Sequence, residues 1–340
     1  MKRNATRRLL TALLAAAMCL SMAACGSKPA ADNGSSDTDA SAGDNAARKY
    51  TIGVCQLVTH DALDAATQGF IAAVPEKLGA DNVDISVQNA ANDQNVCSTI
   101  VNTFVSQKVD LIMANATPSL QAAYNATTEI PILGTAVTEY GVALGLKDFN
   151  GTVGGNVSGT SDLAPLTEQA DMILELFPEA KTVGLLYCSA EPNSQYQVDT
   201  VQGYLEDLGY TCTQYSFSDS NDLSAVATTA CAESDVLYVP TDNTAANNAE
   251  LIGNIALDAQ TPIIAGEEGI CKGCGVATLT ISYYDIGYKT GEMAYEILVN
   301  GADPATMPIE YAPQFTPKYN PTMCEALGLT PPDGYEAIAE

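Results

Sequence analysis

Short apolar runs alternate with segments of helical periodicity along most of the chain. The clearest unit is Asp235–Gly269, where an apolar run at 236–239 is followed by a helical pattern at 244–258 and a second apolar run at 262–265. Such runs are typical of buried parallel strands joined by crossover helices. The same pattern occurs at Asp110–Thr135, and both copies end in a Pro-Ile strand and a Gly turn. Two similar units predict two α/β lobes rather than a solenoid.

The alternation of strands and helices begins at Tyr50 and continues almost to the end of the chain, which predicts an α/β protein with parallel sheets. It is interrupted near Ser158–Pro165 and then restarts. We therefore expect the chain to pass there from a first lobe to a second. The length of the folded part also exceeds one typical core and suits two domains.

The N-terminal 24 residues have a different pattern, in which four basic residues precede an apolar run from Leu9 to Leu20. This run is too short to span a bilayer and is typical of the core of a signal peptide. The segment Met22–Gly26 resembles a bacterial lipobox, which implies cleavage before Cys25 and its lipid modification. An ordinary secretory signal with a chance cysteine is the alternative. Residues 25–49 lack apolar periodicity and are expected to form a disordered tether.

Acidic residues outnumber basic ones, 41 to 14, and four of the basic residues lie in the predicted signal peptide. The mature charge is therefore 10 − 41 = −31. This charge argues against nucleic acid as a partner, because nucleic acid requires a basic surface. It would also repel anionic lipid head groups. A solvated acidic surface that keeps an exported protein soluble accounts for most of it.

Cysteines and the single histidine offer little for catalysis or metal binding. Cys271 and Cys274 form the one close cysteine pair, which we interpret as a hairpin with two incidental thiols, with a local disulfide as the alternative. Zinc is not expected, because His60 is far from this pair in sequence. No nucleophile–base motif is present, so we expect a protein that is not an enzyme and needs neither metal nor cofactor.

Polar residues follow the predicted strands, at the sheet edge where parallel sheets bind ligands. We expect Thr117 to cap a helix whose free N–H groups, with the hydroxyls of Thr117 and Ser119, suit a carboxylate. Asp242 and Glu267 follow strands of the second lobe and would face a cation, although Thr117 and Asp242 could be helix caps only. Glu267 lies in a glycine-flanked loop with no predicted helix to cap. Together these groups suit a zwitterion, so an α-amino acid is the favoured ligand.

Both lobes contain stretches that resemble the ABC-transporter substrate-binding proteins of the tryptophan/tyrosine-binding type: HDALDAATQGF, NATPSLQAA, PILGTAVT, SGTSDLAP, VPTDNT, AGEEG and YYDIGYKTGEMA. The resemblance implies a type I periplasmic-binding fold, in which two Rossmann-like lobes with three crossovers hold a ligand in the cleft between them. It implies a first lobe of residues 50–160 and 280–305 and a second of residues 161–279 and 306–340. An aromatic amino acid would be the preferred ligand, with a sugar or polyamine on the same fold as the alternative.

The expected partners are a small-molecule ligand, an ABC permease and, through a lipid on Cys25, the membrane. The protein is accordingly expected to be extracytoplasmic, anchored to the outer face of the cell membrane or in the periplasm. The candidate ligand-binding residues are Gln56, His60, Thr117, Ser119, Thr135, Thr138, Ser161, Asp162, Ser189, Asn193, Asp242, Asn243 and Glu267, with Glu268 as a further carboxylate.

Overall fold

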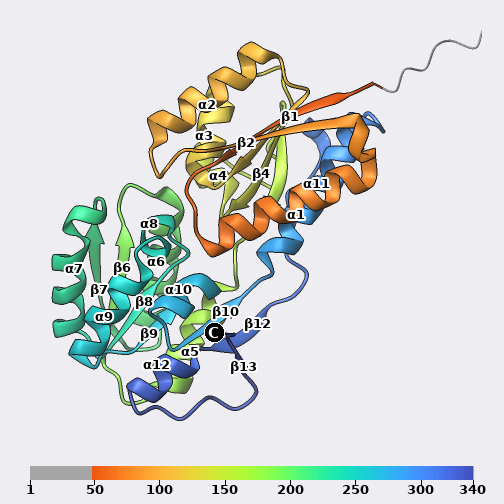
Figure 1. The fold of residues 1–340 in the computed structure, drawn as a ribbon. Coiled ribbons are helices and arrows are strands. Elements are labelled where there is room, and N and C mark those ends of the chain that lie inside the picture. The colour runs from red at the N-terminus through yellow and green to blue at the C-terminus, as the bar shows by residue number, and fades with distance from the viewer. Residues whose placement is uncertain (1–47, 340) are drawn as a thin grey trace, which may run out of the picture. The chain divides into compact units, whose positions relative to one another are not determined.

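The computed structural model describes residues 48–339. The predicted signal peptide, the predicted lipidation site Cys25 and nearly all of the predicted tether lie outside this range. Within it, strands and helices alternate and form two separate, mostly parallel sheets (Figure 1). The predicted α/β fold class is therefore confirmed.

The first sheet has six strands in the order β2-β1-β3-β4-β5-β11, all paired in parallel. Helices α1 and α11 cover one face, where they bury the Ile52 side of β1, and α2, α3 and α4 cover the other (Figure 1). The elements are β1 (Tyr50–Gln56), α1 (Asp61–Leu78), β2 (Val83–Asn89), α2 (Gln94–Gln107), β3 (Leu111–Asn115), α3 (Thr117–Ala126), β4 (Ile132–Val137), α4 (Tyr140–Leu144), β5 (Val157–Ser161), α11 (Tyr283–Leu298) and β11 (Glu310–Tyr311).

The second sheet has the order β7-β6-β8-β9-β10-β12-β13. Its neighbouring strands pair in parallel except for β10 and β12, which are antiparallel. Helices α5, α6 and α12 pack on one face, and α7, α9 and α10 pack on the other. The elements are α5 (Leu166–Leu176), β6 (Thr182–Cys188), α6 (Pro192–Asp207), β7 (Thr211–Phe217), α7 (Ser220–Glu233), β8 (Val236–Val239), α8 (Asn243–Ala246), α9 (Ala249–Ala259), β9 (Ile263–Ala265), α10 (Glu268–Gly273), β10 (Ala277–Thr280), β12 (Thr316–Tyr319), α12 (Pro321–Ala326) and β13 (Glu336–Ala337).

The chain passes between the two sheets three times, after β5, after β10 and after β11. The position of the third passage differs from the predicted boundary between the lobes, which was at residues 305/306. Strand β11 pairs with β5, with Glu310 beside Thr160, and so belongs to the first sheet. The third crossover therefore follows Tyr311, because the chain adds one more edge strand to the first lobe before it leaves.

Three local predictions are wrong. Pro75 predicts a kink or an early end of the first helix, but α1 continues to Leu78, because a proline so near the helix end removes one backbone bond while the buried residues before it stay packed. The segment containing Cys271 and Cys274 is helix α10 rather than a hairpin, and both thiols are buried and free. The predicted helix 244–258 is divided into α8 and α9.

Candidate functional site

Buried polar residues gather at the carboxyl ends of the parallel strands in both lobes. His60 precedes α1, Thr117 begins α3 and Asp162 follows β5 in the first lobe, while Asp242 and Asn243 follow β8 in the second. The parallel strands of each sheet share a direction, so their carboxyl ends lie along one edge, which is where such sheets bind ligands. The strand-end loops of the two lobes are therefore the candidate site.

Helix α3 presents unpaired donors at its first turn. The preceding residue, Ala116, has φ 86° and ψ 159°, a strained conformation for a non-glycine residue, and its N–H is held by the carbonyl of Thr135 at 3.0 Å. Thr117 is thus the first residue of the helix and not its N-cap. The N–H groups of Thr117 and Ser119 and the Thr117 hydroxyl have no hydrogen-bond partner among the described residues. Such a helix start suits an anionic group.

Asp162 lies at the first crossover and is only 4% exposed. Its Oδ2 accepts a hydrogen bond from the hydroxyl of Tyr283 at 3.1 Å, whereas its Oδ1 is buried and has no partner among the described residues. Burial raises the pKa of Asp162 to about 6, although the neighbouring side chains of Thr138 and Tyr283 lower it. A buried carboxylate oxygen without a partner is unfavourable, so this position favours a cation or a hydrogen-bond donor.

Asp242 is equally buried, but both of its oxygens have backbone partners. Oδ1 accepts from the N–H of Ala245 at 2.8 Å, and Oδ2 accepts from the N–H of Cys188 at 2.7 Å. Asp242 is therefore the N-cap of α8 and also joins that helix to the end of β6. Burial and the nearby charge of Glu191 raise the pKa of Asp242 to about 7.

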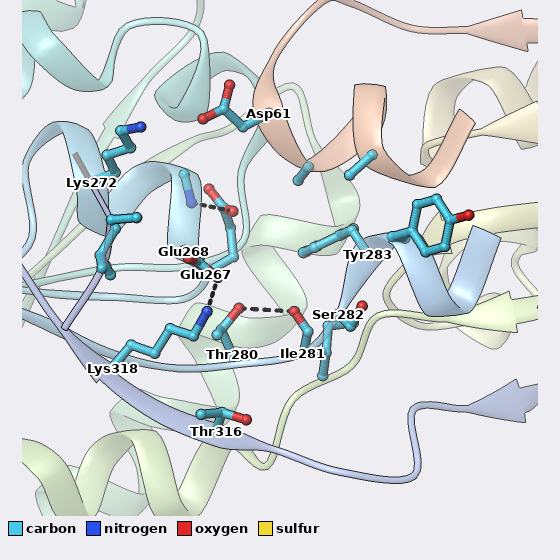
Figure 2. Close-up of a pocket in the computed structure, with 16 residues that line it drawn as sticks. Asp61, Glu267, Glu268, Lys272, Thr280, Ile281, Ser282, Tyr283, Thr316 and Lys318 are labelled. Atoms are coloured by element: carbon cyan, nitrogen blue, oxygen red, sulfur yellow. Dashed lines mark hydrogen bonds and ion pairs between the residues drawn. The ribbon is translucent and has the colours of Figure 1, made fainter. Parts of the chain in front are cut away.

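Glu267 is also a helix cap, which corrects the prediction that it has no helix to cap. Its carboxylate accepts from the N–H groups of Gly269 and Ile270 in the first turn of α10, and burial raises its pKa to about 7. Figure 2 shows Glu267 and Glu268 in a pocket of about 440 Å³, with Lys318 bonded to Glu268 at 2.7 Å. Both glutamates are thus already paired. The sequence could not show this role, because the six-residue helix α10 has no recognisable periodicity.

Glu191 is a buried residue of the site that was not among the predicted ligand-binding residues. Its Oε2 accepts from the N–H and the Nδ2 of Asn243, at 3.0 and 2.7 Å. Its Oε1 accepts from the N–H and the Oγ1 of Thr244, at 2.9 and 2.8 Å. Asn193, two residues farther along, donates to the carbonyl of Thr241 at 3.2 Å, and its Oδ1 is buried without a partner. The only sequence signal for Glu191 was its place in the polar loop after β6.

Two side chains of the first lobe contact this part of the second lobe. His60 Nε2 lies 3.3 Å from Asn243 Oδ1, and Asn92 Nδ2 donates to Thr244 Oγ1 at 3.1 Å. Burial lowers the pKa of His60, which keeps the imidazole neutral. His60 and Asn243 were both predicted site residues, and the structure brings them together. Asn92 was not predicted.

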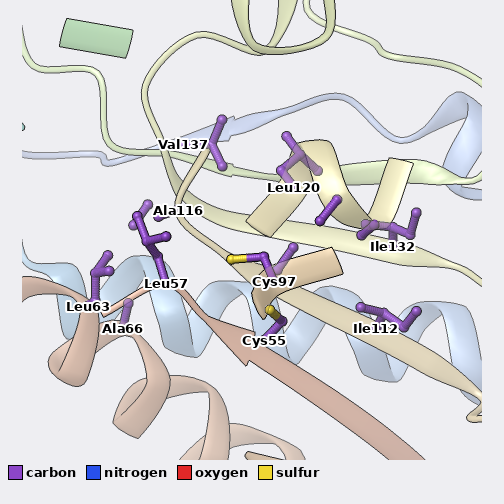
Figure 3. Packing of buried hydrophobic residues seen from close by; sticks show 14 of the residues in the cluster. Cys55, Leu57, Leu63, Ala66, Cys97, Ile112, Ala116, Leu120, Ile132 and Val137 are labelled. Atoms are coloured by element: carbon purple, nitrogen blue, oxygen red, sulfur yellow. The ribbon is translucent and has the colours of Figure 1, made fainter. Parts of the chain in front are cut away.

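Ser119 was predicted to help bind a carboxylate through its hydroxyl, and the structure places that hydroxyl elsewhere. Its Oγ lies 3.6 Å from the Cys55 sulfur and 3.5 Å from the Cys97 sulfur. Figure 3 shows both cysteines among aliphatic residues of the first-lobe core. Ser119 is two positions beyond Thr117, and this places the two hydroxyls on different sides of α3.

Four other predicted residues bond with groups of their own lobe. Gln56, Ser161 and Ser189 lie at or just beyond strand ends as expected, whereas Thr135 lies within β4, and all four side chains serve the fold. Gln56 accepts from the hydroxyl of Thr67 (2.6 Å), and Thr135 pairs with Thr160 (3.0 Å). Ser161 donates to the carbonyl of Thr138 (2.8 Å), and the exposed Ser189 donates to the carbonyl of Phe217 (3.2 Å).

Within residues 48–339, no group of three or more His, Cys, Asp or Glu side chains is arranged to hold a metal ion. In the same part of the chain, no helix has the length and apolar character needed to cross a membrane.

The chain is similar to proteins that bind amino acids. It is 38% identical over 295 residues to the tyrosine-binding protein of Clostridioides difficile (strain R20291), with 86% of this chain and 84% of that protein covered. Its structure superposes with a TM-score of 0.81 on an ABC domain from Streptococcus pneumoniae in complex with L-Trp, 30% identical, with 85% of this chain and 100% of that chain covered.

A third similar protein, from Clostridium difficile, is a ligand-free, open substrate-binding protein with adhesive properties. It is 39% identical and has a TM-score of 0.66, with 85% of this chain and 99% of that chain covered. A family model described as ABC transporter substrate binding protein matches residues 51–339. These matches confirm the predicted family and its two-lobed fold, and the chain belongs to the ABC transporter substrate-binding proteins.

Proposed function

We propose that this protein captures a free α-amino acid, preferably an aromatic one, between its lobes and delivers it unchanged to an ABC permease. The ligand class is supported by the relatives, of which one is named a tyrosine-binding protein and another holds L-Trp. As a substrate-binding protein of an ABC transporter, the chain acts outside the cytoplasm.

The observation that carries the proposal is the unpaired, buried Oδ1 of Asp162. We assign the ligand ammonium to this carboxylate and the ligand carboxylate to the first turn of α3, with the hydroxyl of Thr117. This revises the expectation that Asp242 and Glu267 bind the ammonium, because both of these carboxylates accept backbone N–H groups. His60, Thr138, Asn193 and Asn243 are left as candidates for contacts with the rest of the ligand.

Both assigned elements lie at strand ends of the first sheet, so an amino acid can bind there before the second lobe covers it. Asp162 Oδ1 is shielded from solvent as described, which means that the ligand reaches it when the lobes separate. The comparisons support such a movement. The TM-score is higher for the 30% identical L-Trp complex, 0.81, than for the 39% identical open protein, 0.66. This order is expected when related proteins differ in lobe position rather than in fold.

We also propose that the mature protein is held at the membrane by a lipid on Cys25. The support is the sequence Met22-Ala23-Ala24-Cys25, which resembles a lipobox and is followed by a polar segment suited to a tether. The membrane contact would then be made by the lipid alone, since the acidic protein surface is repelled by anionic head groups.

A thermal-shift screen of the twenty amino acids, common sugars and polyamines tests the ligand class. A ligand that binds the folded state at 100 times its Kd adds about 2.7 kcal/mol of stability, which is readily detected as a rise in Tm. We expect L-tyrosine or L-tryptophan to give the largest rise, with calorimetry to measure the affinity. A rise with a sugar or polyamine and none with any amino acid would overturn the proposal.

A further inference from the structure

Two side-chain hydrogen bonds that join the lobes involve consecutive residues of the second lobe. Asn243 meets His60 and Thr244 meets Asn92, and all four side chains are at least partly buried. The first-lobe partners come from two different loops, the ends of β1 and β2. The contacts are therefore two separate arms that can form only while the lobes lie together.

Both arms end at one carboxylate, that of Glu191. One of its oxygens accepts from Asn243 Nδ2 at 2.7 Å, and the other accepts from Thr244 Oγ1 at 2.8 Å. Glu191 is 3% exposed, and no lysine or arginine of the described chain forms an ion pair with it. Its charge is balanced by the four hydrogen bonds that it accepts from Asn243 and Thr244.

A carboxylate only accepts hydrogen bonds, and this fixes the direction of both arms. Asn243 turns its amide N–H toward Glu191, so its Oδ1 must accept, and His60 must donate from Nε2. Thr244 gives its hydroxyl hydrogen to Glu191, so its oxygen must accept the bond from Asn92 Nδ2. Each first-lobe residue therefore has to be a donor, which the neutral His60 and the amide of Asn92 both satisfy.

We propose that Glu191 anchors a latch, formed with Asn243 and Thr244 of the second lobe and His60 and Asn92 of the first, that sets how strongly the lobes close. Glu191 is then a positioning residue, which acts on ligand affinity through the closing equilibrium. The proposal rests on the proposed function only where amino-acid affinity is the readout. Since the latch bonds exist in the closed arrangement alone, their loss weakens the closed, ligand-holding state.

Two substitutions, one in each lobe, test the latch by removing its hydrogen bonds. Glu191→Gln keeps one accepting oxygen and puts an N–H₂ group in place of the other, so it disturbs one of the two arms, whichever way the amide turns. Asn92→Asp leaves the second lobe untouched but turns a donor into an acceptor facing Thr244. Asp also tolerates the left-handed backbone of Asn92, whose φ is 64°. Each lost neutral bond is expected to raise Kd about 2- to 12-fold, and both together about 5- to 150-fold.

The test measures calorimetric affinity for L-tyrosine and L-tryptophan together with small-angle scattering of the ligand-free proteins. The matched controls are Glu206→Gln in α6 and Asn102→Asp in α2, both at exposed positions. We expect weaker binding and a larger radius of gyration for Glu191→Gln and Asn92→Asp, with neither change in the controls. A double variant that combines Asn92→Asp with Thr244→Val should bind no more weakly than Thr244→Val alone, because that change already removes the hydroxyl that Asn92 contacts.

Multiplicative losses in this double variant would overturn the latch, because Asn92 and Thr244 would then act independently of each other. If Glu191→Gln does not fold, Asn92→Asp alone decides, and affinity and scattering equal to Asn102→Asp reject the proposal. If the wild type binds none of the amino acids, the proposed function fails, while scattering still tests the latch. Identical ligand-free curves for wild type, Glu191→Gln and Asn92→Asp would then reject it.

Discussion

Replacing Asp162 by Asn should weaken ligand binding severely while relieving the folded protein of a buried charge. The two effects have opposite signs, which separates a ligand-binding role from a structural one. Asn keeps the size of the side chain and can still bond to the Tyr283 hydroxyl, which donates to Oδ2 at 3.1 Å in the wild type. What the substitution removes is the negative charge on an oxygen that has no partner.

The magnitude of the stability effect follows from the pKa. Burial raises the pKa of Asp162 from 3.8 to about 6, so between these values the folded state binds more protons than the unfolded state, and stability falls as pH rises. A shift of about 2 units corresponds to about 3 kcal/mol at roughly 1.4 kcal/mol per unit. Asn does not titrate. The stability of Asp162→Asn relative to wild type should therefore increase by about 3 kcal/mol from pH 3.5 to 7.5, whatever constant cost the buried amide brings.

The binding effect is expected to be larger. Loss of one partner of a buried charge pair costs about 2–5 kcal/mol, or roughly 30- to 5,000-fold in Kd. Urea unfolding at pH 3.5 and 7.5 measures the change in stability, and calorimetry with L-tyrosine and L-tryptophan measures the change in Kd. Asp207→Asn, at an exposed position, is the charge control. Binding within twofold of wild type would refute the assignment of Asp162 to the ligand ammonium, and a stability difference that does not change with pH would refute the raised pKa of Asp162.

Four further outcomes are expected. Thr117→Ala should raise the Kd of the amino acid about 2- to 12-fold and leave that of the decarboxylated amine unchanged, since one neutral hydrogen bond to the carboxylate is lost; calorimetry that shows equal losses for both ligands would argue against this role. Cys25→Ser should release the protein from the membrane fraction or leave it unprocessed, whereas normal processing and membrane binding would exclude the lipid anchor. Scattering at saturating amino acid should show compaction, because the crossovers allow the lobes to close, and unchanged curves at proven saturation would contradict hinge closure. Burial raises the pKa of Glu267 from 4.5 to about 7, so this residue should make wild-type stability fall between pH 4.5 and 7. Urea unfolding of Glu267→Gln should show a flatter dependence over that range, and an equal slope in both proteins would contradict it.

Strand–helix alternation was enough to predict two parallel sheets, because runs such as Val236–Val239 are too apolar for any place but a covered sheet. The same criterion failed for the C-terminal strands β12 and β13, because it requires an apolar run. Strand β12 (Thr316–Tyr319) contains Pro317 and Lys318 and is only partly buried, so its sequence has no apolar run. It is a strand because it pairs antiparallel with β10, and such pairing with a distant partner is not visible locally.

Strand-end position predicted which loops form the candidate site, but not where each side chain points. Thr117 and Ser119 are two residues apart in similar surroundings, yet only Ser119 turns toward the cysteines of the core. Glu191 was missed because its partners lie 52 and 53 residues later in the chain. Topology joins the loops after β6 and β8, and no spacing rule along the chain records that contact.

The buried acidic residues of the site differ in whether they accept hydrogen bonds from the start of a helix. Four acidic residues of the described chain are buried, namely Asp162, Glu191, Asp242 and Glu267. Three of them accept backbone N–H groups at the start of a short helix, so their oxygens are already paired within the protein. Asp162 precedes no such helix and retains an unpaired oxygen at a crossover between the lobes. A ligand ammonium bound there would pair with the one unpaired oxygen among these four carboxylates, at a crossover about which the lobes turn, so that binding and closure are favoured together.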